Sequence, residues 1–415
     1  MDTKQIKLHP ELEKAVMDLG FSEFTEIQEK VIPLIQQGHD VIGLSHTGSG
    51  KTAAFGFPSL EKVTKGQGIQ LLILVPTREL CNQVAKEMFK FAKYKPLRIV
   101  ETYGGVSISP QIQMLQHADV VVSTPGRMLD HMERRTINLS KVKILILDEA
   151  DKMFEMGFID DVKRIISQTP KDRQTLLFSA TMGHGVTEIV HHYMRTPTKI
   201  KLQSYVDKSK LIQHYYDINA RDKFSLLVHV LKQNNEGLAI IFCATRRMVD
   251  ILNSNLGKQG IKAEALHGGL SQNMRKHVMD AFHAHKLDAL IATDVAARGL
   301  DIKNVSYVIN YDIPKTSEDY VHRIGRTARA GSEGKVVSLL AAQDHGNFRC
   351  VLQDRSLLMH KMEIPAFERI PFEMQGGARP EHRGGFRGGG GGRGGGSSRG
   401  SGNRGSSGGF RGRGR

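Results

Sequence analysis

Eight consecutive residues combine glycines, a lysine and a threonine in a spacing that suits phosphate binding. Ser45-His46-Thr47-Gly48-Ser49-Gly50-Lys51-Thr52 follow an apolar run at 41–44 and precede a stretch with helical spacing. Glycines let a backbone turn tightly, so its N–H groups can point at phosphate oxygens. Lys51 would reach the β- and γ-phosphates, and the Thr52 hydroxyl would hold Mg²⁺. The alternative is a plain glycine turn beside a solvent-exposed lysine.

An acidic tetrad provides the partner that such a phosphate site needs. Asp148-Glu149-Ala150-Asp151 follow the apolar run at 143–147. In open parallel sheets, ligands gather at the carboxyl ends of the strands. Adjacent carboxylates there repel one another unless a cation lies beside them. We expect Asp148 on the Mg²⁺ side and Glu149 orienting or deprotonating an attacking water. The alternative is that these carboxylates only cap the next helix.

Three basic residues late in the chain are spaced by four and three positions. On a helix, His322, Arg326 and Arg329 would share one face. Two arginines on one face are costly unless they meet anions, and a γ-phosphate is a suitable anion. We expect Arg326 and Arg329 to act as arginine fingers when two domains close, with Asp301 pairing with one of them or contacting a ribose. The alternative is a surface cluster of salt bridges.

Ten short apolar runs, rich in Val, Ile and Leu, alternate with helical stretches in the first 375 residues. Runs of this kind suit strands that are buried on both faces, and their alternation with helices predicts an α/β fold with parallel sheets. Because the runs form two series, we predict two such domains. The series are 41–44, 71–75, 120–122, 144–147 and 175–178, followed by 238–242, 262–266, 289–292, 305–309 and 336–340.

Domain boundaries follow from composition. We predict a first domain over 1–203, a linker over 204–211 and a second domain over 212–372. The remainder, 373–415, is predicted to be a disordered tail, because a segment of mostly Gly, Ser and Arg cannot bury enough apolar area to offset its ordering entropy.

The charge of the chain favours a polyanionic partner. Its net charge is +15, and the segment 376–415 contributes nine arginines against one acidic residue. No apolar run approaches the roughly 20 residues that a spanning helix needs, which disfavours a membrane partner. Cys81, Cys243 and Cys350 are too scattered for a disulfide framework or a zinc site. We therefore expect a cytoplasmic protein, with a monomeric core.

From Leu8 to Phe372 the chain resembles the DEAD-box RNA helicases, whose motifs it carries in the family's order. The resemblance implies two tandem RecA-like domains that bind ATP and Mg²⁺, and RNA-stimulated hydrolysis that locally unwinds RNA duplexes or remodels RNA–protein complexes. The segments that carry it are 20–28, 76–80, 104–105, 124–127, 148–151, 179–181, 241–243, 267–269, 293–301 and 322–329.

The resemblance also implies roles for individual residues. Phe21 and Gln28 would contact adenine, although Phe24 stands where the family usually has proline and no aromatic residue precedes Phe21. Further ATP contacts would come from Gly299, Asp301, Arg326 and Arg329. Hydrolysis would be coupled to unwinding by Asp151, Ser179, Thr181 and His322. RNA-backbone contacts would come from Pro76, Thr77, Arg78, Gly104, Gly105, Thr124, Arg127, Gly268, Arg275 and Thr293.

The tail interleaves arginine with glycine and two phenylalanines. The arginines suit phosphate contacts and the rings suit base stacking, which favours an RNA anchor built from Arg383, Phe386, Arg387, Phe410 and Arg411. The alternative is a solubilising or self-associating segment. For the whole chain, the alternatives are a DNA-directed helicase, an RNA clamp in which hydrolysis only times release, and an adaptor without ATPase activity.

Overall fold

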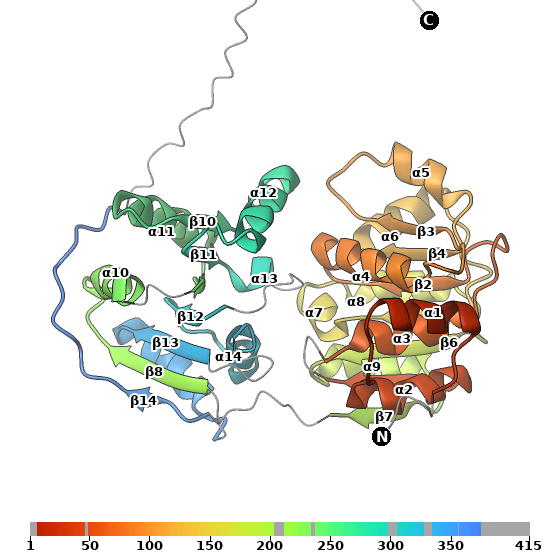
Figure 1. Ribbon diagram of the computed structural model, residues 1–415, viewed down its shortest axis with the longest axis horizontal. Helices are drawn as coiled ribbons and strands as arrows, with labels where there is room; N and C mark the ends of the chain where they lie inside the picture. Colours follow the sequence, from red (N-terminus) through yellow and green to blue (C-terminus); the bar gives the residue numbers. More distant parts are fainter. Residues whose placement is uncertain are drawn as a thin grey trace, which may run out of the picture. The chain divides into compact units, whose positions relative to one another are not determined.

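The computed structural model describes residues 6–45, 49–202, 211–233, 237–297, 305–327, 334–355 and 357–374. Within these ranges the chain forms two seven-stranded parallel sheets, each flanked by helices (Figure 1). The predicted α/β class with two tandem sheet domains is confirmed. None of the described helices is both long and apolar enough to cross a lipid bilayer.

The first sheet has the strand order β3-β4-β2-β5-β6-β1-β7. Its strands are β1 (Val41–Leu44), β2 (Leu71–Leu74), β3 (Ile99–Thr102), β4 (Val120–Ser123), β5 (Ile144–Leu147), β6 (Gln174–Ser179) and β7 (Thr198–Lys201). The helices of this part are α1 (Pro10–Asp18), α2 (Glu26–Gln36), α3 (Lys51–Glu61), α4 (Arg78–Phe91), α5 (Ser109–Leu115), α6 (Pro125–Glu133), α7 (Ala150–Glu155), α8 (Ile159–Ser167) and α9 (His184–Tyr193).

The second sheet has the order β10-β11-β9-β12-β13-β8-β14. Its strands are β8 (Leu211–Asp217), β9 (Ala239–Phe242), β10 (Ala263–Leu266), β11 (Ala289–Ala292), β12 (Tyr307–Asn310), β13 (Gly334–Leu340) and β14 (His360–Lys361). The helices are α10 (Lys223–Gln233), α11 (Arg246–Lys258), α12 (Gln272–His283), α13 (Asp294–Ala297), α14 (Ser317–Ile324), the short 3₁₀ helix η3 (Ala342–Asp344) and α15 (His345–Val351).

Each sheet is buried on both faces, which explains why inner strands such as β2, β5 and β9 are continuously apolar. In β2, Leu71 and Ile73 point into one core while Leu72 and Leu74 point into the other. Successive side chains of a strand alternate between the two faces, so a sheet with two covered faces needs continuous apolar runs. The strand β9 repeats the pattern on the two cores of the second sheet.

All ten predicted runs overlap strands, and four strands were not predicted. Strand β3 has only two buried apolar residues, and β7 alternates half-buried with exposed residues, as expected at sheet edges. Strand β8 mixes polar and aromatic residues, and β14 has only two residues. The predicted linker lies outside the described residues except for Leu211, which the structure instead places at the start of β8.

An extended segment, 360–373, closes the second part of the chain. It runs from β14 past α10 to α11 (Figure 1). The ring of Phe372 lies 4.9 Å from that of Phe224, and Glu373 exchanges two backbone hydrogen bonds of 3.0 Å with the Asn255 amide. The described chain thus packs through Glu373, which the sequence had assigned to the tail. The rest of the predicted tail, from 375 on, lies outside the described residues.

Candidate nucleotide and RNA sites

The phosphate loop lies between β1 and the first turn of α3. Lys51 is 7% exposed, and its Nζ donates to the Ser45 carbonyl oxygen at 2.8 Å. Gly50 caps α3 with a φ of +92°, and a Cβ there would lie 2.5 Å from Gln28 Nε2. The loop therefore requires glycine at this position. Thr52 is half-buried in the same helical turn, whereas 46–48 lie outside the described residues.

Gln28 supports the phosphate loop. Its side chain is buried, its Nε2 donates to the Gly50 carbonyl oxygen at 3.1 Å, and its Oε1 accepts from the Thr25 backbone N–H at 2.9 Å. Gln28 therefore faces the phosphate loop and not the solvent. Nearby, the Phe21 ring packs edge-on against Phe57, with 5.8 Å between the ring centroids. Contact of Gln28 and Phe21 with adenine stays a prediction.

The acidic tetrad is buried where β5 ends. Asp148 is 3% exposed, and burial raises its pKa to about 6, although the Lys51 ammonium lowers it. Ser179 links the two segments geometrically, because its carbonyl oxygen accepts the Ser45 backbone N–H at 3.1 Å and its hydroxyl accepts the Asp151 backbone N–H at 3.3 Å. The tetrad therefore lies beside the phosphate loop, and a shared nucleotide site stays a prediction. Glu149 adopts the left-handed conformation, with φ +50° and ψ +47°, and its backbone N–H donates to Asp148 Oδ1 at 2.9 Å.

The Glu149 carboxylate has one satisfied and one unsatisfied oxygen. Its Oε1 lies 2.9 Å from Lys152 Nζ, whereas its Oε2 is buried without a hydrogen-bond partner. Burial alone would raise the pKa of Glu149, but Lys152 and Lys51 outweigh it and hold that pKa below the ordinary value. The carboxylate is therefore ionised at neutral pH, with one oxygen available to a ligand or to water.

Asp151 ties the tetrad to the end of β6. Its Oδ2 accepts from the backbone N–H groups of Ala180 and Thr181 at 3.0 and 2.9 Å and from the Thr181 hydroxyl at 3.1 Å. The Ser179 hydroxyl accepts from the Asp151 backbone N–H at 3.3 Å and donates to the Thr181 carbonyl oxygen at 2.8 Å. Three of the four residues predicted to couple hydrolysis to unwinding thus form one network, whereas the fourth, His322, lies in α14.

The residues near the phosphate loop fit a magnesium ion. Asp148 and Glu149 offer carboxylate oxygens and Thr52 a hydroxyl, and hard oxygen donors are the ligands that Mg²⁺ prefers. The unpartnered Oε2 of Glu149 further shows that this polar site is not satisfied by the protein alone. Mg²⁺ in nucleotide sites typically uses one or two carboxylates together with phosphates and water, so a larger protein cluster is not required.

In the first part of the chain, two arginines converge on one loop between β3 and α5. A Cβ on Gly105, whose φ is +80°, would lie 2.0 Å from Arg78 Nη1. Arg127 Nη2 donates to the Val106 carbonyl oxygen at 2.9 Å, while Arg127 Nη1 is buried without a partner. Burial lowers the pKa of Arg127, with a smaller contribution from Arg78. The structure therefore brings together Arg78, Gly104, Gly105 and Arg127.

Three other predicted RNA contacts in this part lie at the starts of helices. Pro76 is buried ahead of α4, and the Thr77 hydroxyl caps that helix by accepting from the Leu80 backbone N–H at 3.3 Å. Thr124 precedes α6, and its backbone N–H donates to the Thr102 carbonyl oxygen at 3.1 Å. The Thr77 side chain therefore caps its helix, whereas the Thr124 side chain makes no capping hydrogen bond.

In the second part, the predicted RNA contacts Gly268 and Thr293 follow β10 and β11, and Arg275 lies in α12. A Cβ on Gly268 would lie 3.2 Å from Arg246 Nη2, so this arginine lies beside the glycine. His267 Nδ1 accepts from the Gly269 backbone N–H at 3.1 Å, which makes Nε2 the N–H that faces Asp250 Oδ1 at 2.9 Å. Arg275 Nε is buried without a partner, and Thr293 follows β11.

The predicted helical face of His322, Arg326 and Arg329 needs correction. Helix α14 ends at Ile324, so Arg326 lies in the following turn and does not share a helix face with His322. Arg326 is buried, at 4% exposed, which contradicts the alternative of a surface salt-bridge cluster for this residue. Arg329, Gly299 and Asp301 lie outside the described residues.

Sequence reasoning missed Arg323. This buried residue pairs bidentately with Asp294 at 2.6 and 2.8 Å, and its Nη1 donates to Asn310 Oδ1 at 2.9 Å. It shares the inner face of α14 with Tyr320 and Ile324, at spacings of three and one. No short sequence pattern signals the burial of a basic residue, so only the fold reveals it.

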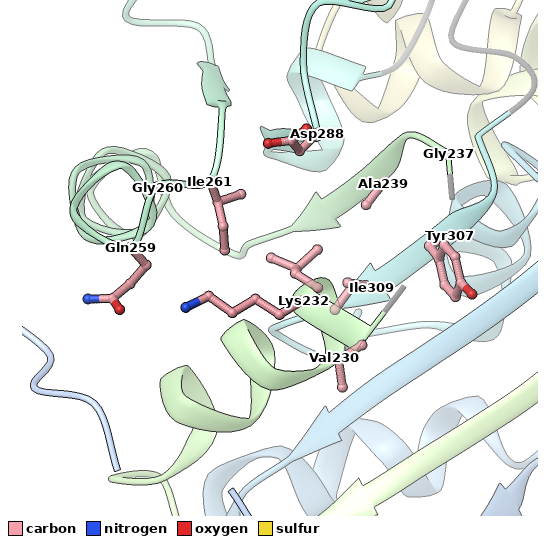
Figure 2. A pocket seen from close by; sticks show the side chains of 11 residues that line it. Val230, Lys232, Gly237, Ala239, Gln259, Gly260, Ile261, Asp288, Tyr307 and Ile309 are labelled. Atoms are coloured by element: carbon pink, nitrogen blue, oxygen red, sulfur yellow. The ribbon is translucent and has the colours of Figure 1, made fainter. Parts of the chain in front are cut away.

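A separate cavity lies at the other end of the second sheet (Figure 2). Its volume is about 240 Å³, and its lining includes Ala239 and Tyr307, the first residues of β9 and β12, together with Lys232, Gln259 and Asp288. None of the predicted site residues lines it. The phosphate loop and the acidic tetrad instead lie where β1 and β5 end, the edge at which open α/β sheets bind ligands.

Comparison with known proteins identifies the family of the chain. Residues 25–189 match the DEAD/DEAH box helicase family, and residues 222–331 match the helicase conserved C-terminal domain. An ATP-dependent RNA helicase CshA from Listeria monocytogenes is 44% identical over 364 residues, which cover 87% of this chain and 70% of the relative.

Two solved structures extend the comparison. A DEAD box protein from Methanococcus jannaschii is 41% identical, with a TM-score of 0.52, and covers 88% of this chain and 99% of its own. Saccharomyces cerevisiae Dbp5 bound to RNA and ADP BeF3 is 32% identical, with a TM-score of 0.78, covering 87% and 95%. The chain belongs to the DEAD-box family of ATP-dependent RNA helicases.

Proposed function

We propose that the chain is an RNA-stimulated ATPase that locally unwinds RNA duplexes or remodels RNA–protein complexes. The observation that carries this proposal is that the phosphate loop lies beside a buried acidic pair, because Ser179 accepts hydrogen bonds from the backbone of both Ser45 and Asp151. Burying the Asp148 and Glu149 carboxylates costs free energy, and the ion pairs and hydrogen bonds of the protein offset only part of that cost. A bound nucleotide with its cation would recover it.

The residues of the first domain divide the work of hydrolysis. The loop 45–52 would cradle the phosphates, with Lys51 contacting the transferred group, and Thr52 and Asp148 would hold Mg²⁺. The bound ion would neutralise phosphate charge. Glu149 would orient or deprotonate the attacking water through Oε2, because Lys152 already occupies Oε1. Arg326 and Arg329 would supply positive charge to the γ-phosphate from the second domain.

Coupling to RNA would run through the network at the end of β6. Asp151 holds the backbone of Ala180 and Thr181, so a change at the acidic tetrad reaches this segment directly. His322 would complete the coupling from the second domain. If ATP and RNA both favour a closed arrangement of the domains, each ligand strengthens the binding of the other, and release of phosphate reopens the protein.

RNA would be gripped by its backbone without sequence preference. Arg78 and Arg127 on the first domain and Arg275 on the second carry the charge, and the adjoining glycines allow close approach. The structure of Dbp5 bound to RNA and ADP BeF3 supports this choice of ligands. The RNA-containing targets would include ribonucleoprotein complexes, acted on by a monomeric core in the cytoplasm.

The tail would act as an RNA anchor. Arginine and phenylalanine in 376–415 suit phosphates and bases, and a tethered second site raises the local RNA concentration. Deleting 376–415 should weaken RNA affinity, measured by fluorescence anisotropy, and leave the ATPase rate at saturating RNA unchanged. Loss of the saturated rate would contradict the anchor and assign the tail a part in turnover.

Displacement of a short RNA strand from a duplex tests the proposed activity. The wild-type protein should release the strand with ATP, and Glu149→Gln should bind the duplex without releasing it in repeated cycles. If Glu149→Gln were fully active, hydrolysis would only time release, and the protein would be an RNA clamp. Equal activity on a DNA duplex would favour a helicase without RNA preference.

A further inference from the structure

Lys152 is a buried lysine to which no function has yet been assigned. Its side chain is 4% exposed in α7, directly after the acidic tetrad. Burying an ammonium group is costly unless a carboxylate pairs with it. Its partner is Glu149 Oε1, at 2.9 Å, and that carboxylate is also buried, at 5% exposed.

The backbone places these two groups one helical turn apart. Glu149 caps α7 in the left-handed conformation, and Lys152 follows three residues later. Side chains at this spacing meet on one side of a helix. Glu149 adopts this left-handed conformation with a φ of +50°.

The neighbouring carboxylate, Asp151, has hydrogen-bond partners of its own. Asp151 Oδ2 already accepts three hydrogen bonds from Ala180 and Thr181, and its Oδ1 accepts the Lys152 backbone N–H at 3.0 Å. The ion pair of the Lys152 ammonium group is with Glu149 Oε1, at 2.9 Å. It occupies one Glu149 oxygen, and Oε2 stays buried without a hydrogen-bond partner.

We propose that Lys152 is a positioning residue, which fixes the Glu149 carboxylate so that Oε2 faces the attacking water. This inference rests on the proposed function and assigns Lys152 to the hydrolysis step rather than to nucleotide or RNA binding. A carboxylate that loses one of its anchors can rotate, and a misplacement of about 1 Å can lower a rate by about 100-fold. Removal of Lys152 should therefore lower kcat and spare binding.

The experiment compares Lys152→Met with wild type in the full chain. The RNA-saturated ATPase kcat should fall at least about tenfold, while the affinity for a fluorescent ADP and the RNA concentration for half-maximal stimulation should change less than about twofold. Lys163→Met is the matched control, because Lys163 also pairs with carboxylates, at 2.6 Å from Glu188, but lies in α8 outside the site. It should retain the wild-type kcat.

A double-variant cycle separates positioning from a general structural effect. In a Glu149→Gln background, Lys152→Met should cause no further loss in single-turnover hydrolysis, because the group it positions is already gone. The double variant also carries no unpaired buried charge, so it folds even if Lys152→Met alone does not. Lys152→Arg keeps the charge and should recover part of the lost kcat.

Three results would overturn the inference. These are an unchanged or higher kcat in Lys152→Met, an equal loss in the Glu149→Gln background, and a parallel loss of ADP affinity. If wild-type protein showed no RNA-stimulated hydrolysis, the proposed function itself would fail. If wild type were active and Lys152→Met matched it, only the role of Lys152 would be wrong.

Discussion

Each of the two sheet domains contains a buried charged side chain, and the two side chains differ in how far the protein satisfies their hydrogen bonding. In the first, Glu149 has one oxygen paired with Lys152 and the other without a partner. In the second, the Arg323 guanidinium pairs bidentately with Asp294 and also donates to Asn310. Both charges lie near the carboxyl ends of the strands of their sheet. The protein supplies hydrogen-bond partners to the Arg323 guanidinium, whereas Glu149 Oε2 has none within the protein and can accept a hydrogen bond from a bound ligand or water.

The difference separates a structural charge from a functional one. A fully satisfied buried network makes its part of the protein rigid, while a half-satisfied network costs stability and leaves bonding capacity for a ligand. An unpartnered atom alone is not sufficient, since Arg173 Nε is also buried without a partner and has no predicted role. The assignment of Glu149 depends equally on its position beside the phosphate loop.

The largest expected effect is the loss of stability on removing the Arg323 guanidinium, whose partners all lie within the protein. Replacing Arg323 with methionine would leave Asp294 and Asn310 without their partner, and breaking a buried pair costs about 3–5 kcal/mol. Urea unfolding should show this loss in the free energy of unfolding. The control is Arg349→Met, because Arg349 is exposed on α15. A loss below about 1 kcal/mol for Arg323→Met would mean that the network contributes little.

Removing the charge of Asp148, a predicted functional residue, should instead increase the free energy of unfolding. The pKa of Asp148 is raised to about 6 from 3.8, so the folded state holds this proton more tightly than the unfolded state. In the nucleotide-free protein, stability is therefore lost as the pH rises through this window, by at most about 3 kcal/mol. Asp148→Asn should stabilise the protein at pH 7, and the gain should shrink as the pH falls below 6. A destabilised variant at pH 7 would contradict this explanation.

The smallest expected effect is on RNA affinity. Arg127→Gln should weaken RNA binding about tenfold and reduce the slope of log affinity against log salt by about 1, because one phosphate contact is lost. ADP binding should not change. Arg134→Gln is the control, since Arg134 lies on the exposed side near the end of α6 and pairs with Asp130. Equal losses in both variants would indicate general electrostatics and not a specific contact.

Much of this arrangement could be predicted from the sequence. The inner strands were predictable because burial on both faces demands continuous apolar residues, as in Leu71–Leu74. The phosphate loop and the acidic tetrad were predictable because their chemistry requires particular residue types at a particular spacing. Edge strands such as β7 carry a weaker signal, since one side of the strand lies open to water.

Other features depend on tertiary contacts that no short pattern encodes. Arg323 and Lys152 are ordinary basic residues in the sequence, and only the fold reveals that both are buried against carboxylates. Helix α14 ends before Arg326, although the spacing of four from His322 suits a longer helix, and both residues still line one small pocket. The link from Gln28 to Gly50 likewise spans 22 residues and two elements.

The steady-state ATPase rate, with no nucleic acid, with RNA and with single-stranded DNA, tests the central claim most directly. We predict selective stimulation by RNA, which disappears in Lys51→Ala and in Glu149→Gln while both variants stay folded. No stimulation by either nucleic acid, in folded protein that binds ATP, would contradict the assignment of this chain as an RNA-stimulated ATPase.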